Sequence, residues 1–135
     1  MCREEALALS SLSMELNSLN VKLHAVVHEK LGADAFKEFF AGDVYLDTER
    51  TFYGPHERWM SLALLLRVGV ISNIYRNTKK NIKGNMEGEG RLLGGVFVIG
   101  PGDQGILFHH EEKEFGDHAD INQVLQAAKR VKKLN

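Results

Sequence analysis

The first chemistry that this sequence offers is thiol chemistry, because its single cysteine, Cys2, stands where a helix is expected to begin. Apolar residues at steps of three and four predict one helix from about Arg3 to Leu19; they are Leu9, Leu12, Leu16 and Leu19. Free amide groups at the start of a helix stabilise a thiolate. Arg3 would add to this effect while Glu4 and Glu5 would oppose it, so the direction of the net shift in thiol pKa stays open.

A disulfide inside the chain is excluded, because Cys2 has no second cysteine to pair with. A dithiol cycle would therefore need another molecule, either an external thiol reductant or a partner protein, to resolve the oxidised cysteine. A mechanism with one cysteine is the other route. We expect Cys2 to be the catalytic residue, and an inert thiol is the alternative that the sequence leaves open.

Histidine and glycine patterns predict no second site. His109 and His110 are neighbours on an expected strand, so their side chains point to opposite faces and do not readily chelate one metal ion. His24 and His28 could share a face, but no third ligand suggests itself. The glycines between positions 84 and 95 lack the spacing of a dinucleotide loop and precede a strand. We therefore expect no cofactor and no metal ion.

Charge and composition narrow the function classes. The 17 basic and 18 acidic residues give a formal charge of -1, which leaves no positive field for nucleic acid. The run from Leu62 to Ile71 is interrupted by Arg67 and is too short to span a membrane, for which about 20 residues are needed. The charged run from Glu111 to Glu114, with Asp117, is expected to be a surface turn.

Length and cysteine content predict one domain over residues 1–135 in a reducing compartment. A chain of 135 residues with 44% hydrophobic and 26% charged residues is large enough for one core and too short for two ordinary domains. A single cysteine fits a reducing environment. The start of the chain is acidic where a signal peptide needs a basic lead, so we expect a cytoplasmic protein.

Strands are expected to alternate with helices and to end in a hairpin followed by a helix. The predicted strands are Val21–Val27, Val44–Leu46, Val96–Ile99 and Ile106–Phe108. Further helices are predicted at about Ala33–Phe40, His56–Asn77 and Ile121–Leu134. This order indicates an α/β domain with a mixed sheet between two helical layers, as in thioredoxin-like proteins.

Several stretches of the sequence resemble the peroxiredoxin-like 2 family, also called the selenoprotein U family. The resemblance covers essentially the whole chain. It rests on Cys2-Arg3-Glu4-Glu5-Ala6, Phe52-Tyr53-Gly54-Pro55, Gly84 to Gly90, Leu93 to Gly100, Gln104 to Leu107 and Glu112 to Asp117. It implies a thioredoxin-like, peroxiredoxin-like fold and a redox-regulatory antioxidant function in which thiol chemistry reduces oxidants.

The resemblance also implies what this chain lacks. Family members carry a C-x-x-C motif, or selenocysteine in its first position, and Cys2 matches the second cysteine only. The central strand that leads into the motif would precede Met1, so we expect unpaired edges on the strands at 21–27 and 96–99. Unpaired edges invite pairing with another chain, which predicts lower stability and self-association.

Two other functions follow from the resemblance. The chain could be a noncatalytic regulatory or interaction fragment, with the gap in its sheet filled by a partner strand. A sister group in the family implies a prostaglandin F synthase-like endoperoxide reductase, against which the missing first cysteine counts. Thioredoxins have a proline before the hairpin strand that faces their active site, whereas this chain has Gly94-Gly95, so recognition of disulfides in the thioredoxin manner is not expected.

Overall fold

The computed structural model describes residues 2–53, 57–59, 92–114 and 116–132. Most of the helix predicted at 56–77 and of the glycine-rich loop before residue 92 lies outside the described residues, as does the apolar run at 62–71. Within the described ranges, no helix combines the length and the apolar character that crossing a bilayer requires.

The predicted N-terminal helix is two helices, α1 (Cys2–Ser10) and α2 (Ser13–Ser18). The single helix that the leucine spacing predicts is therefore wrong at positions 11 and 12. The hydroxyl of Ser10 donates to the Ala6 carbonyl and that of Ser11 to the Ala8 carbonyl, both at 2.6 Å. Hydroxyls that bond back to the preceding turn commonly bend helices, which accounts for the break.

A parallel strand pair follows the two helices. Strand β1 (His24–Val27) pairs with β2 (Asp43–Leu46), with His24 opposite Asp43 and Val27 opposite Leu46. The connection passes through the short helix α3 (Ala33–Lys37). Strand β1 begins three residues later than predicted, and α3 ends three residues earlier.

The predicted hairpin is present, and its strands are longer than predicted. Strand β3 (Gly95–Ile99) pairs antiparallel with β4 (Ile106–Glu111). The turn between them contains the 3₁₀ helix η3 (Gly102–Gln104), flanked by an irregularity in register between Val98 and Ile99. Gly102 and Gly105 have φ angles of 58° and 67°, in the left-handed region that glycine adopts without strain.

The last described element is helix α5 (Ile121–Ala128), which begins where the sequence predicts and ends earlier than Leu134. The Asp120 carboxylate accepts a hydrogen bond from the main-chain N–H of Asn122 at 2.8 Å and caps the helix. Its apolar face packs on α2, β3 and β4. The buried core of these elements is formed by Leu12, Leu16, Val98, Ala119, Val124, Ala127 and Ala128.

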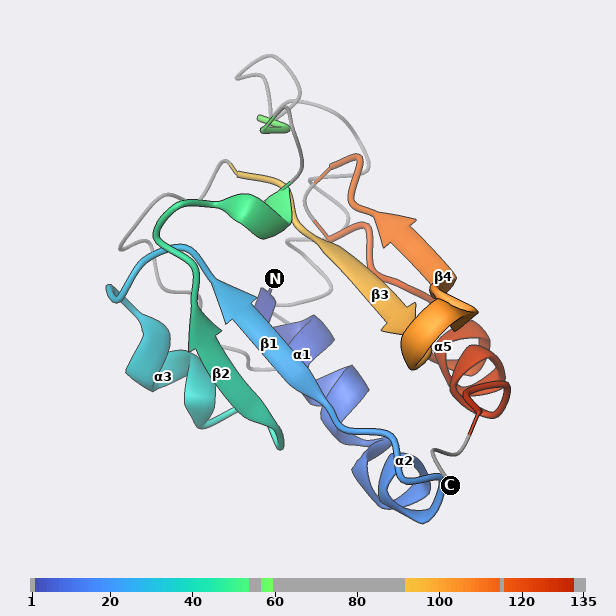
Figure 1. Cartoon of the computed structure of the whole chain (residues 1–135). Coiled ribbons are helices and arrows are strands. Elements are labelled where there is room, and N and C mark those ends of the chain that lie inside the picture. Colours follow the sequence, from blue (N-terminus) through green and yellow to red (C-terminus); the bar gives the residue numbers. More distant parts are fainter. Residues whose placement is uncertain (1, 54–56, 60–91, 115, 133–135) are drawn as a thin grey trace.

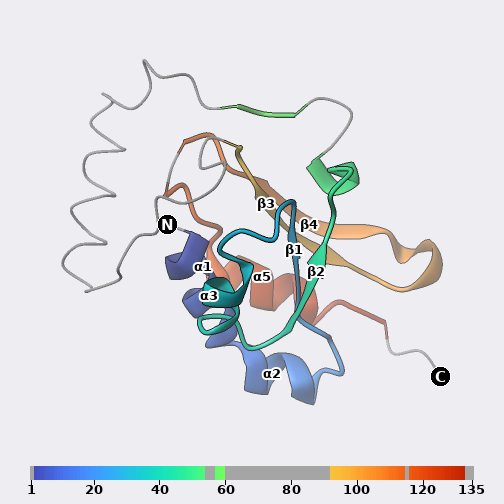
Figure 2. The same cartoon turned by 90° about the vertical axis from the view of Figure 1, so that its left-hand side faces the viewer.

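Among the described residues, the strands form two separate two-stranded sheets rather than one. Both lie in the same mixed α/β molecule, with β1 and β3 as neighbours and α1 beside them (Figure 1). A view turned by 90° shows α1, α2 and α3 together beside the strands (Figure 2). Within the described part of the chain, the edge of β1 away from β2 and the edge of β3 away from β4 have no strand partner, and in Figure 1 these two edges are turned toward each other.

Candidate functional site

Helix α1 begins at Cys2, so the cysteine stands at the helix start that the sequence predicts. Glu4 and Glu5 lie in the same first turn. Both are withdrawn from solvent, and Glu4 is only 6% exposed. The start of α1 therefore carries two carboxyl groups that point into the protein rather than into water.

The segment before α5 meets these two carboxyl groups. His118 Nε2 lies 3.0 Å from Glu4 Oε2, and His118 Nδ1 lies 4.0 Å from Glu5 Oε1. The main-chain N–H of Ala119 also donates to Glu5 Oε1 at 3.1 Å. The contacts of Glu4 with His118 and of Glu5 with Ala119 each join residues 114 positions apart in the sequence. They hold the first turn of α1 against the chain that leads into α5.

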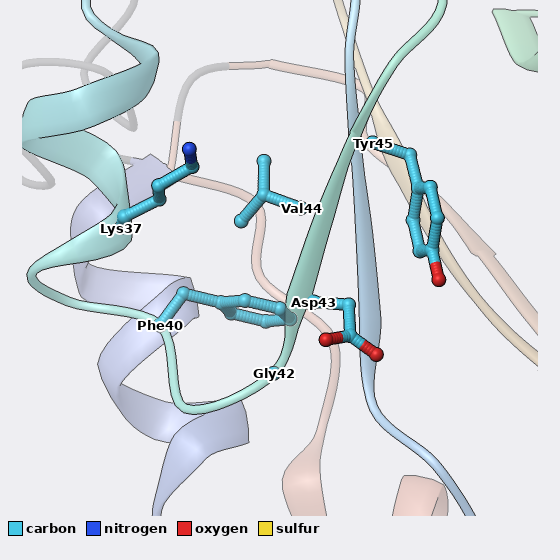
Figure 3. Close-up of a pocket in the computed structure, with 6 residues that line it drawn as sticks. All are labelled: Lys37, Phe40, Gly42, Asp43, Val44 and Tyr45. Atoms are coloured by element: carbon cyan, nitrogen blue, oxygen red, sulfur yellow. The ribbon is translucent and has the colours of Figure 1, made fainter.

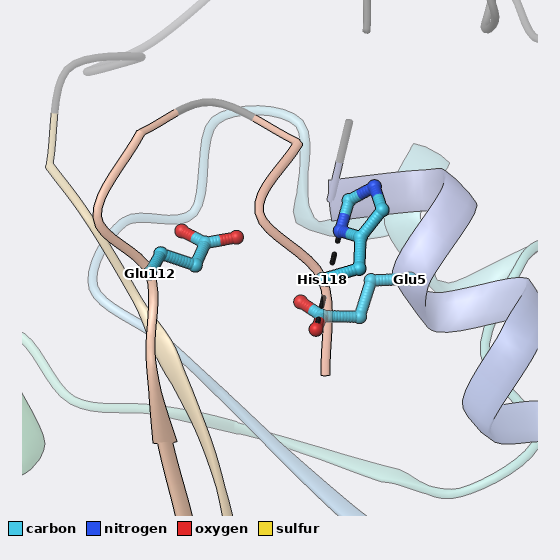
Figure 4. A group of neighbouring side chains, drawn as sticks. All are labelled: Glu5, Glu112 and His118. Carbon is cyan, nitrogen blue, oxygen red and sulfur yellow. Dashed lines mark ion pairs between the residues drawn. The ribbon is translucent and has the colours of Figure 1, made fainter. Parts of the chain in front are cut away.

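A third carboxyl group reaches the same place from the end of the hairpin. Glu112 follows β4 and is 8% exposed, and its Oε2 accepts a hydrogen bond from the Gly94 N–H at 2.9 Å. Figure 4 shows Glu5, Glu112 and His118 reaching toward one another from three separate segments. One ligand atom from each of the three lies within 4.8 Å of the others.

Burial makes these carboxyl groups hold protons more tightly than usual. Removal from water raises the pKa of Glu5 above its ordinary value, which the Ala119 N–H partly offsets. Burial likewise raises the pKa of Glu112, which its hydrogen bond from Gly94 opposes and the nearby charge of Glu5 reinforces. The site is therefore a buried acidic cluster in which both carboxyl groups resist ionisation.

Arg58 fixes the hairpin end that carries Glu112. Its guanidinium donates to the main-chain carbonyls of Glu112 and Gly94 at 3.0 and 2.8 Å, and it lies 3.5 Å from the Glu111 carboxylate. Gly95 permits this packing, because a Cβ atom there would stand 2.7 Å from the His110 carbonyl oxygen. Of the two glycines at the position where thioredoxins have proline, Gly95 thus serves close backbone approach, whereas a Cβ atom at Gly94 would make only an ordinary contact with the Glu112 carboxylate at 3.6 Å.

The structure does not bring the histidines considered from their sequence spacing into one group. His109 stacks on Phe97 with 4.3 Å between ring centroids, whereas His110 Nε2 contacts the Asp117 carbonyl at 3.0 Å. His24 contacts Asp43 at 3.4 Å, and His28 lies 3.7 Å from Glu29. Within the described ranges, Glu5, Glu112 and His118 form the one group that could hold a metal ion.

Reasoning from the sequence misses this cluster. The expectation of a surface turn from Glu111 to Glu114 is wrong for Glu112, since it is buried and hydrogen-bonded. The sequence draws attention to Glu4 and Glu5 only for their effect on Cys2, and nothing in it singles out His118. A signal is available in Glu112, which continues the alternation of β4 after the exposed Glu111.

Apart from the buried cluster, a concave region lies between α3 and β2 (Figure 3). Val44 points from β2 toward α3, the Phe40 ring points from the segment after α3 toward β2, and Tyr45 lies on the other side of β2 (Figure 3). Lys37 contacts Asp34 at 3.6 Å, and both side chains are largely exposed. This shallow region gathers no set of groups with an evident chemical role.

Comparison with known proteins places the chain in a class. A family model described as AhpC/TSA antioxidant enzyme matches residues 8–114, and the chain therefore belongs to that family. The match extends from α1 through the hairpin to the segment that carries Glu112. A search of the solved structures gives no match.

Individual relatives are named Peroxiredoxin-like 2A, which confirms the resemblance inferred from the sequence motifs. The chain is 51% identical to the Gallus gallus protein over 134 residues and 50% identical to the Xenopus laevis protein over 135 residues. Each match covers 98% of this chain and 60% of the relative. The Homo sapiens protein is 48% identical over 134 residues, which cover 58% of its length. The chain thus spans about three-fifths of these relatives.

Proposed function

We propose that this chain is a thiol-based antioxidant protein of thioredoxin-like fold in which Cys2 reduces oxidants. The observation that carries the proposal is that α1 begins at Cys2 in a chain that belongs to the AhpC/TSA antioxidant enzyme family. Free amide groups at a helix start favour the thiolate, which is the reactive form of cysteine. The proposal treats residues 1–135 as one domain acting in the reducing cytoplasm.

With a hydroperoxide as the oxidant, the proposed reaction balances as follows. The Cys2 thiolate attacks the outer peroxide oxygen, the O–O bond breaks, and the alkoxide leaves and takes up a proton as the alcohol. Cys2 becomes a sulfenic acid. An external thiol then displaces water to form a mixed disulfide, and a second thiol releases reduced Cys2 with an external disulfide. No second cysteine of this chain is required.

Alkylation by iodoacetamide across pH tests the reactivity of Cys2. We expect the folded chain to react faster at neutral pH than the same chain unfolded in urea, because unfolding removes the helix start while leaving the thiol and its sequence neighbours in place. Equal rates in the folded and unfolded chain would show that the fold does not activate Cys2. The variant Cys2→Ser supplies the background rate.

A noncatalytic interaction function is the second candidate, and one observation favours it. Within the described residues the facing edges of β1 and β3 have no strand partner, and Phe97 and Ile99 on β3 are 40% and 58% exposed. Open strand edges pair readily with other chains. On this proposal a strand from a second copy or a partner protein completes the sheet, and the chain is less stable alone than a longer relative.

Light scattering after size exclusion distinguishes the two candidates, together with the alkylation rates. An interaction function predicts association that persists in Cys2→Ser and no activation of the thiol. An antioxidant function predicts an activated thiol whatever the oligomeric state. A chain that stays monomeric over a wide concentration range would contradict self-association through the strand edges.

A further inference from the structure

We propose that Glu5, Glu112 and His118 form a binding site for a divalent metal ion of the Zn²⁺ type. The three side chains come from α1, from the end of the hairpin and from the segment before α5, and their ligand atoms lie within 4.8 Å of one another. Carboxylate and imidazole groups are both ordinary protein ligands of Zn²⁺ and other first-row divalent ions. The inference goes beyond thiol chemistry, because none of the proposed ligands is Cys2.

His118 is oriented for this role by Glu4. Glu4 Oε2 lies 3.0 Å from His118 Nε2, and its side chain is only 7% exposed. A proton on Nε2 is donated to this carboxylate, which leaves the lone pair of the neutral ring on Nδ1. That nitrogen is buried and has no hydrogen-bond partner. Metal-bound histidines characteristically donate their other ring N–H to a carboxylate, which is the arrangement that a proton on Nε2 gives His118.

The two carboxylate ligands are also held in place. Glu5 accepts from the Ala119 N–H at 3.1 Å, and Glu112 accepts from the Gly94 N–H at 2.9 Å. Such outer hydrogen bonds commonly orient carboxylates in metal centres. Each carboxyl group retains a second oxygen for an ion.

The distances require a modest contraction on binding. Bonds of about 2.1 Å to a tetrahedral ion place ligand atoms about 3.4 Å apart. The ligand atoms lie within 4.8 Å of one another, so side-chain movements on the order of 1 Å bring them to the distances that a bound ion requires. Long glutamate side chains can make such movements by rotation about their own bonds.

A divalent ion would replace the protons that burial favours on Glu5 and Glu112, because carboxyl groups bind metal ions in their deprotonated form. Glu5 and Glu112 are neighbouring carboxyl groups removed from water, and Asp117 adds a further negative charge near both. The nearby His110 contacts Asp117 directly. Its Nε2 lies 3.0 Å from the Asp117 carbonyl oxygen and 3.6 Å from the Asp117 carboxylate. A divalent ion would neutralise the two buried carboxylates and join the first turn of α1 to the hairpin and to α5.

Equilibrium titration with Zn²⁺ tests the site in the full chain carrying Cys2→Ser, so that the thiolate is not available. We expect one ion per chain. Glu4→Gln should weaken binding about 10- to 100-fold, as loss of an orienting partner does, and His118→Gln should weaken it further. The control His109→Gln removes a half-exposed imidazole stacked on Phe97 and should leave the affinity unchanged.

Two results would overturn the proposal: no stoichiometric binding, or equal losses in His118→Gln and His109→Gln. Circular dichroism checks that each variant folds. If His118→Gln does not fold, the absorption spectrum of Co²⁺ added to the unsubstituted chain tests the site instead. The spectrum of bound Co²⁺ should show d–d bands typical of nitrogen and oxygen ligands and should lack a thiolate charge-transfer band. A thiolate band, or no bands at one equivalent, would contradict the proposal. Neither result bears on peroxide reduction by Cys2.

Discussion

Removing the side chain of Glu112 should destabilise the protein because it leaves a main-chain donor without its partner. Glu112 Oε2 accepts from the Gly94 N–H at 2.9 Å, in a side chain that is 8% exposed. An unsatisfied donor costs about 1–3 kcal/mol when it is fully buried, and the lower part of this range applies to the half-buried Gly94. The methylene group that Glu112→Ala also removes contributes about 0.8 kcal/mol. The expected loss is therefore about 2–3 kcal/mol relative to Glu112→Gln.

Glu112→Gln is the reference for this comparison because its amide oxygen can still accept from Gly94 while the charge is gone. Both variants are unfolded in urea with a chelator present, and the free energy of unfolding is measured by circular dichroism. Glu111→Ala is the neighbouring control. Its side chain is 51% exposed and contacts Arg58 at 3.5 Å, so it should lose less than about 1 kcal/mol. Equal stability of Glu112→Ala and Glu112→Gln would refute the assigned hydrogen bond.

Three further substitutions test the packing around the site by urea unfolding. Gly95→Ala should cost about 1–3 kcal/mol because its Cβ would lie 2.7 Å from the His110 carbonyl oxygen. Gly94→Ala is the control and should be tolerated, because its Cβ would lie 3.6 Å from the Glu112 carboxylate. Equal losses of stability in the two variants would contradict the assigned clash at Gly95. Asp120→Ala removes the cap of α5 and should cost about 0.5–2 kcal/mol, and an unchanged midpoint would show the cap to be unimportant. Ser10→Ala should cost about 1 kcal/mol because Ser10 Oγ accepts from the Ala41 N–H at 2.9 Å. Ser11→Ala loses only a local bond and is the control, so a loss as large as that of Ser10→Ala would count against the tie to Ala41.

Local signals predict the elements that local chemistry determines. The hairpin follows from its Gly-Pro-Gly turn between apolar runs, and α5 begins at the residue after its Asp120 cap. The break between α1 and α2 is not predicted, because the leucine spacing continues through it while the serine hydroxyls bond back to the chain. The spacing of apolar residues indicates which face of a helix is buried, but it does not indicate where serine hydroxyls bend the helix.

The candidate site is predictable only in part. The helix start at Cys2 follows from the pattern of leucines in the same segment. The contact between Glu5 and the segment of His118 joins positions more than a hundred residues apart, and no local spacing indicates it. Glu112 stands in a charged run, and charge alone favours a solvated turn. Its burial depends on the Gly94 N–H and on Arg58, which hold the hairpin end.

The most direct test of the proposed antioxidant chemistry is the trapping of a sulfenic acid on Cys2. The reduced chain is treated with one equivalent of hydrogen peroxide and then with dimedone, and the product is mapped by mass spectrometry while peroxide loss is followed. We predict one adduct, on Cys2, together with peroxide consumption that Cys2→Ser abolishes. An unmodified Cys2, with peroxide consumed at the same rate by Cys2→Ser, would contradict the account.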